Sequence, residues 1–178
     1  MDMTEKQLTS TYAFEGRIMK ARVDTVELPN GKTAEREVCE HVGGVGILPI
    51  DEQGNVYLVR QFRYPYGKVL LEIPAGKVEA DETDPLACGK RELREETGFT
   101  AEEMIDLGEV YPSPGFLTEV LHLYAAKGLH SGQTDPDEDE FVETVCMPMK
   151  ELCAKIAQGE IQDGKTIAAV CKAKLLQL

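Results

Sequence analysis

One helical segment near the middle of the chain constrains the fold more than any other feature. Residues 83–97 (TDPLACGKRELREET) carry a proline near the start and end at Gly98, and glycine commonly terminates a helix. On a helical wheel, Leu86 and Leu93 form a narrow apolar stripe that could face a core. The segments on both sides are rich in strand-forming residues. We therefore expect this helix to pack against a β-sheet.

The order of the other predicted elements indicates the fold class. An antiparallel hairpin is expected around a Pro-Asn-Gly turn at 29–31, followed by strands, the helix, more strands and two C-terminal helices. The predicted strands are 17–28, 32–41, 42–50, 55–62, 69–73, 105–111, 119–126 and 140–147, and the late helices are 149–158 and 164–176, with Asp163 as an N-cap. This order predicts an α/β sandwich with a mixed central sheet between helices. A small N-terminal antiparallel β subdomain (1–41) would precede the main domain (42–178).

The central helix concentrates negative charge on one face. Glu92, Glu95 and Glu96 fall within five residues, and like charges three or four positions apart repel by roughly 0.2–0.5 kcal/mol per exposed pair. Gly89 lies one turn earlier on the same side, although glycine inside a helix costs roughly 1 kcal/mol relative to alanine. Periodicity alone also fits a solvent-exposed helix with pairs such as Arg91–Glu95. The alternative is a divalent-metal site, in which Gly89 would leave space beside the carboxylates.

Composition excludes several classes of partner. The formal charge of −13 disfavours nucleic acid and anionic membranes, which need a basic surface, but it permits a phosphorylated substrate bridged by cations. The start, MDMTEKQLTS, lacks the basic and apolar regions of a secretory signal, and the chain has no apolar run of membrane-spanning length. Five widely spaced cysteines predict reduced thiols and a cytoplasmic protein.

The residues around the helix carry a recognisable motif. Gly76, Glu82 and the run RELREETGF (91–99) resemble the Nudix box, with eight residues between Glu82 and Arg91 where the usual box has seven. The segments VRQFRYP, EIPAGK, YPSPGF and DEDEFVE, together with Pro114, are similar to the ADP-ribose pyrophosphatase branch of the Nudix hydrolases. The resemblance covers most of residues 14–170.

The resemblance implies roles for particular residues. The expected metal ligands are Glu92, Glu96 and the backbone carbonyl of Ala75, with Glu95 binding directly or through water, and with Glu140 in the DPDEDE loop (135–140) holding a further metal. Glu138 is the expected base that activates water, although Glu138 and Glu140 could exchange roles, and Arg91 would orient the glutamates. By composition alone, the DPDEDE run fits a solvated loop, which charge runs of this kind usually are. The expected substrate contacts are Arg36, Glu37, Arg63 and Glu119, although both arginines could instead form surface ion pairs.

The resemblance also implies an activity. We expect Mg²⁺-dependent (or Mn²⁺-dependent) hydrolysis of ADP-ribose to AMP and ribose 5-phosphate by a homodimer in which Arg36 completes the partner's site. Another nucleoside-diphosphate sugar, a dinucleotide, or a sensing module that binds without cutting remain alternatives. His41, His122 and His130 show no pattern with a carboxylate partner in the sequence, so we expect structural or surface roles for them rather than catalysis.

Overall fold

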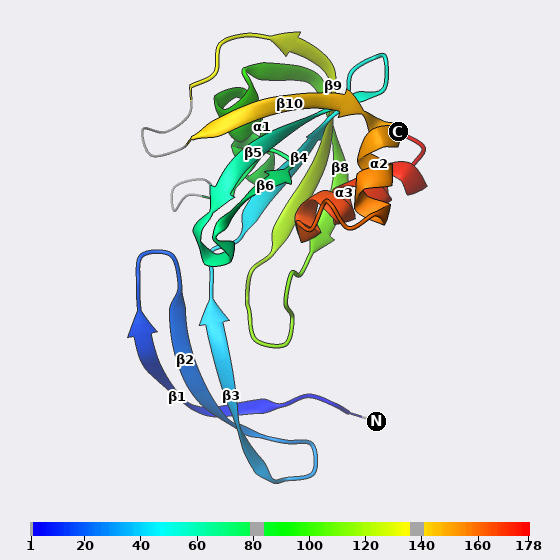
Figure 1. The fold of residues 1–178 in the computed structure, drawn as a ribbon. Coiled ribbons are helices and arrows are strands. Elements are labelled where there is room, and N and C mark those ends of the chain that lie inside the picture. Colours follow the sequence, from blue (N-terminus) through cyan, green and yellow to red (C-terminus); the bar gives the residue numbers. More distant parts are fainter. Residues whose placement is uncertain (1, 79–83, 136–140) are drawn as a thin grey trace. The chain divides into compact units, whose positions relative to one another are not determined.

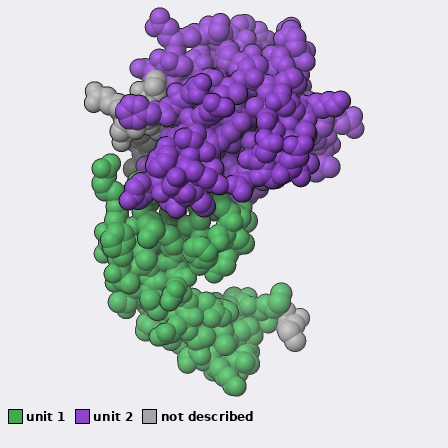
Figure 2. Space-filling model, viewed as in Figure 1, with its two compact units in different colours: residues 1–43, 111–120 green, residues 44–110, 121–178 purple. Residues whose placement is uncertain are grey.

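The computed structural model describes residues 2–78, 84–135 and 141–178. The chain forms two compact units (Figure 1). Unit 1 comprises residues 1–43 and 111–120, and unit 2 comprises residues 44–110 and 121–178 (Figure 2).

Unit 1 is built on a three-stranded antiparallel sheet with the order β1-β2-β3. Its strands are β1 (Lys6–Glu15), β2 (Lys20–Glu27) and β3 (Thr33–Glu40). The predicted hairpin is confirmed: β2 pairs with β3, and Gly31 closes the turn at φ 78° with its N–H donated to the Leu28 carbonyl at 2.8 Å. β1 was not predicted. Every residue of β1 is exposed, so its sequence has no buried face to give it a clear alternation.

Unit 2 contains two sheets. A mixed sheet has the order β7-β4-β9-β8, in which only the β4–β9 pair is parallel, and an antiparallel sheet has the order β10-β5-β6. The mixed sheet contains β4 (Gly44–Pro49), β7 (Ala75–Lys77), β8 (Phe99–Val110) and β9 (Leu121–Ser131), and the antiparallel sheet contains β5 (Asn55–Arg63), β6 (Lys68–Glu72) and β10 (Val142–Pro148). A short 3₁₀ turn, η1 (Tyr64–Tyr66), joins β5 to β6.

Helices cover both faces of the mixed sheet. β4 is buried along its whole length, with Val45 and Ile47 in one apolar cluster and Leu48 in another. The first cluster includes Cys88 and Leu93 of α1 (Pro85–Thr97). The second includes residues of α2 (Met149–Ala157) and α3 (Gly164–Leu175). The predicted α/β sandwich is therefore confirmed (Figure 1).

The central helix ends as its sequence indicates and begins at Pro85, two residues after the predicted start at 83. Asp84 caps it by accepting the Leu86 N–H at 3.0 Å, Pro85 follows at the first helical position, and Gly98 ends it at φ 74°. A Cβ on Gly98 would lie 2.7 Å from the Gly132 carbonyl oxygen, so this position needs glycine for its space as well as for its dihedral angle. Among the helices of the described residues, none is long and apolar enough to cross a membrane.

Candidate active site

The two glutamates predicted as metal ligands are buried. Glu92 is 7% exposed and Glu96 is 2% exposed, and both lie on the face of α1 that packs toward the sheet. Residues four apart lie on the same side of a helix, so a single helix face carries both carboxylates. These two positions therefore do not fit the alternative interpretation of a solvent-exposed helix face.

The backbone of β7 lies directly against both carboxylates. The Ala75 N–H donates to Glu96 Oε2 at 2.9 Å. At Gly76, an added Cβ would overlap the carboxylate of Glu92. The Pro-Ala-Gly segment and the helix therefore meet at Ala75, Gly76, Glu92 and Glu96, which are the residues that sequence reasoning grouped together.

Arginines offset the charge of the acidic face. Arg91 Nη1 lies 2.9 Å from Glu92 Oε1 and 2.8 Å from Glu95 Oε2. Arg94 Nη2 lies 3.1 Å from Glu95 Oε1. The repulsion that the glutamate spacing implies is thus reduced by ion pairs within the same helix.

The interpretation of Gly89 as a spacer beside the carboxylates is wrong. A Cβ at Gly89 would meet side chains of the sheet at ordinary contact distances, 3.5 Å from Tyr124 and 3.6 Å from Ile47 and Met104. Gly89 therefore faces the core. The glycine that makes room for a carboxylate is Gly76.

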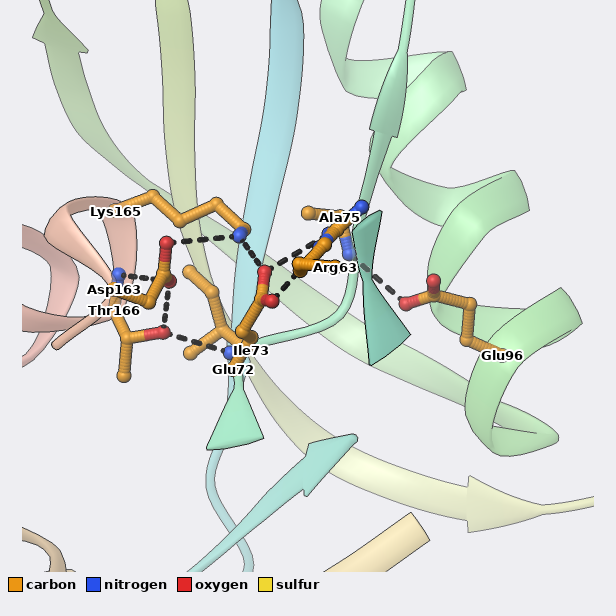
Figure 3. A network of polar contacts seen from close by, with 8 residues as sticks. All are labelled: Arg63, Glu72, Ile73, Ala75, Glu96, Asp163, Lys165 and Thr166. Atoms are coloured by element: carbon orange, nitrogen blue, oxygen red, sulfur yellow. Dashed lines mark hydrogen bonds and ion pairs between the residues drawn. The ribbon is translucent and has the colours of Figure 1, made fainter. Parts of the chain in front are cut away.

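Arg63 lies in a network of charged side chains around the buried Glu72 that the sequence did not reveal (Figure 3). Its guanidinium donates to both oxygens of Glu72, at 2.8 and 2.9 Å, and Lys165 also donates to Glu72. Glu72 is 1% exposed. The only feature of the sequence that indicates a special role for Glu72 is its charge in the otherwise apolar strand VLLEI (69–73).

Electrostatics bind this network together. Burial by itself would raise the pKa of Glu72, but the hydrogen bonds and charges of Arg63 and Lys165 outweigh it and hold the pKa below its usual value. The hydrogen bonds to Glu72 raise the pKa of Arg63. The predicted role of Arg63 in binding substrate stays a prediction.

Three predicted substrate contacts belong to unit 1. Arg36 donates to the carboxylate of Glu5 at 2.6 and 2.9 Å. Glu37 is exposed in β3, and Glu119 Oε1 lies 3.3 Å from Nδ1 of His41.

The other two histidines also lie near carboxylates, His122 at 3.6 Å from Glu109 and His130 at 3.0 Å from Glu102. These contacts show carboxylates that the sequence pattern did not reveal, and the expected structural or surface roles of the histidines stay a prediction.

The remaining predicted acids fall outside the described residues. These are Glu82 of the box and the loop residues Glu138 and Glu140. Asp135, the first residue of the DPDEDE loop, is described and donates its N–H to the Glu95 carbonyl at 3.0 Å.

The donors around Ala75 suit a hard divalent cation. In the ranges 2–78, 84–135 and 141–178, no three His, Cys, Asp or Glu side chains converge as a complete ligand set. Mg²⁺ commonly takes only one or two carboxylates, with waters and substrate phosphate oxygens completing its shell. Two buried carboxylates beside a glycine backbone fit that pattern.

The fold and this acidic face define a hydrolase of the Nudix class. The NUDIX domain family matches residues 40–170, and the nucleoside diphosphate sugar hydrolase N-terminal domain matches residues 5–39. The chain belongs to the Nudix hydrolase family, as its box indicated.

Several proteins of named function are similar to this chain. The chain is 43% identical over 168 residues to a methanol dehydrogenase activator of Bacillus methanolicus, covering 93% of this chain and 90% of that protein. It is 37% identical over 170 residues to an ADP-ribose pyrophosphatase of Bacillus subtilis, covering 94% and 91%. It is 40% identical over 151 residues to a GDP-mannose pyrophosphatase of Yersinia enterocolitica, covering 78% of each. A crystal structure of an ADP compounds hydrolase shares the fold with a TM-score of 0.86 at 19% identity, covering 99% of this chain and 96% of that one.

Proposed function

We propose that this protein hydrolyses the pyrophosphate bond of ADP-ribose to AMP and ribose 5-phosphate. The observation that carries the proposal is the pair of buried carboxylates, Glu92 and Glu96, against the Ala75–Gly76 backbone. The name of the Bacillus subtilis relative supports ADP-ribose as the substrate.

Glu92, Glu96 and the Ala75 carbonyl would hold Mg²⁺, or Mn²⁺ in its place, with Glu95 as a further direct or water-mediated ligand. When bound, such a cation neutralises charge on the pyrophosphate and polarises it toward attack. Arg91 keeps Glu92 and Glu95 in place through its two ion pairs.

The reaction itself consumes one water. The water oxygen bonds to one phosphorus, the bridging P–O bond breaks, and each product keeps one phosphate. Glu138 or Glu140 would take the proton of the attacking water. Arg63 would contact the diphosphate, and Arg36, Glu37 and Glu119 would contact the rest of the substrate.

The proposal includes a homodimer in which residues of the N-terminal hairpin, including Arg36, complete the site of the partner. The exposed apolar side chains of β1 support it, since Leu8, Tyr12 and Phe14 are 45–55% exposed. Light scattering combined with an activity assay tests this arrangement, and a fully active monomer would contradict it. We also propose a cytoplasmic protein with reduced thiols, because its five cysteines are widely spaced in the sequence.

A substrate panel tests the activity. Purified protein would be incubated with ADP-ribose, GDP-mannose and a dinucleotide, with and without Mg²⁺, and phosphate would be measured after phosphatase treatment. We expect the highest kcat/KM for ADP-ribose and dependence on Mg²⁺. Preference for GDP-mannose would show that the substrate is a nucleotide sugar other than ADP-ribose. Binding of these compounds without their cleavage would indicate a sensing module.

A second candidate role is activation of a dehydrogenase. It is favoured by the 43% identity to the methanol dehydrogenase activator. Adding the protein to a methanol dehydrogenase assay tests it, and Glu92→Gln in the same assay shows whether activation requires hydrolysis.

A further inference from the structure

The first turn of α3 reaches the segment that carries the proposed metal-binding backbone (Figure 3). Asp163 caps the helix by accepting the Thr166 N–H at 3.0 Å. The Thr166 hydroxyl donates to the same carboxylate at 2.5 Å and accepts the Ile73 N–H at 2.8 Å. Thr166 and Ile73 are both fully buried.

Each residue from Glu72 to Ala75 forms a hydrogen bond or an ion pair with another segment. Lys165 and Arg63 hold the Glu72 side chain, and Thr166 holds the Ile73 N–H. The Pro74 carbonyl accepts the Ile47 N–H at 2.8 Å, and the Ala75 N–H is bound by Glu96. The position of the Ala75 carbonyl is therefore determined by contacts from α3, β4 and α1.

The Thr166 hydroxyl is held in one orientation. Because it donates to Asp163, its oxygen lone pairs are directed to the Ile73 N–H. Lys165 keeps Asp163 in place from the other side, at 3.0 Å from its Oδ1. Removal of the hydroxyl would leave the Ile73 N–H buried without its acceptor, which favours a shift of the backbone.

We propose that Thr166, supported by Asp163 and Lys165, is a positioning residue that sets the Ala75 carbonyl for the divalent cation. This inference rests on the proposed function, because it concerns the cation of the same site. Residues that orient a metal's ligands typically change metal affinity when they are substituted, even without touching the metal. Thr166 would act in this way through Ile73.

The test measures metal binding directly. Mn²⁺ binding to the full chain would be followed by electron paramagnetic resonance without substrate, in wild type, Thr166→Val and Thr166→Ser. The control is Thr100→Val, an exposed threonine of β8. We expect the Mn²⁺ dissociation constant to rise roughly 10-fold in Thr166→Val, to recover in Thr166→Ser, and to stay unchanged in the control. At saturating Mg²⁺, the KM for ADP-ribose should stay close to the wild-type value.

The outcomes separate this inference from the proposed function. Unchanged Mn²⁺ affinity in a folded Thr166→Val protein would overturn the positioning role alone. Absence of saturable Mn²⁺ binding in the wild type would overturn the proposed metal site and this inference with it. If Thr166→Val does not fold, Lys165→Met replaces it, with the exposed Lys174→Met on the same helix as its control. Weaker Mn²⁺ binding in Lys165→Met alone supports the inference, and equal binding in both overturns it.

Discussion

Glu72→Gln should destabilise the protein strongly, because it removes the shared negative partner of two cations. Glu72 is 1% exposed, and the side chain of Lys165 is 11% exposed. Breaking a buried ion pair by removing one partner costs roughly 3–5 kcal/mol. The Arg63 side chain is 35% exposed and Lys165 keeps Asp163, so both cations retain some compensation. We therefore expect a loss near the lower limit, about 3 kcal/mol.

The assay is thermal unfolding followed by circular dichroism at neutral pH. For a chain of this length, about 3 kcal/mol corresponds to a decrease in Tm of roughly 6–12 °C. Glu143→Gln is the control, since Glu143 pairs with Arg60 on the surface with its side chain 70% exposed, and little change is expected. A decrease below about 2 °C in Glu72→Gln would refute the view that this network stabilises the fold.

The difference in stability between wild type and Glu72→Gln should depend on pH. The pKa of Glu72 is lowered in the folded protein, so its contribution to stability is complete above the unfolded-state pKa of about 4.3. That contribution is lost as the pH falls through the lower, folded-state pKa. The difference in Tm between wild type and Glu72→Gln should therefore be largest near neutral pH and should shrink below about pH 4. A difference that grows on acidification would contradict this sign.

Three further substitutions test the site and its supports. Glu92→Gln should lower kcat for ADP-ribose by orders of magnitude and leave the circular dichroism spectrum unchanged, and near-normal turnover would exclude a metal site at this position. Gly76→Ala should weaken Mn²⁺ binding in a calorimetric titration, because its Cβ would overlap the Glu92 carboxylate, whereas Gly164→Ala, with open space around its Cα, should not. Gly98→Ala should lower Tm, because it combines a φ of 74° with a 2.7 Å approach to the Gly132 carbonyl, and an unchanged Tm would show that the turn can relax.

Local signals predicted the helix ends and the acidic face. Gly98 ends α1 and Asp163 caps α3, and both depend on neighbours within four residues. The pairing of Glu92 with Glu96 follows from helical periodicity. These features need no knowledge of distant parts of the chain.

Contacts between distant segments could not be predicted in this way. Lys165 and Glu72, and likewise Thr166 and Ile73, are 93 residues apart. Helical periodicity placed Gly89 beside the glutamates, but only the packing of α1 on the sheet shows that it contacts Tyr124 and Ile47. The close approach that requires a glycine occurs at Gly76, on a different strand.

The backbone that carries Ala75 is the structural link between these observations. Every residue has a backbone carbonyl, so the residue type alone does not make one of them a metal ligand. The position of the carbonyl therefore has to be determined by the groups that hold the chain. Glu96 holds Ala75 from α1, and Thr166 holds Ile73 from α3. Because Glu96 is also a proposed ligand, any shift of this segment would move two donors together. The polar contacts of α3 are therefore expected to affect cation binding as well as stability, although none of them lies on the acidic helix.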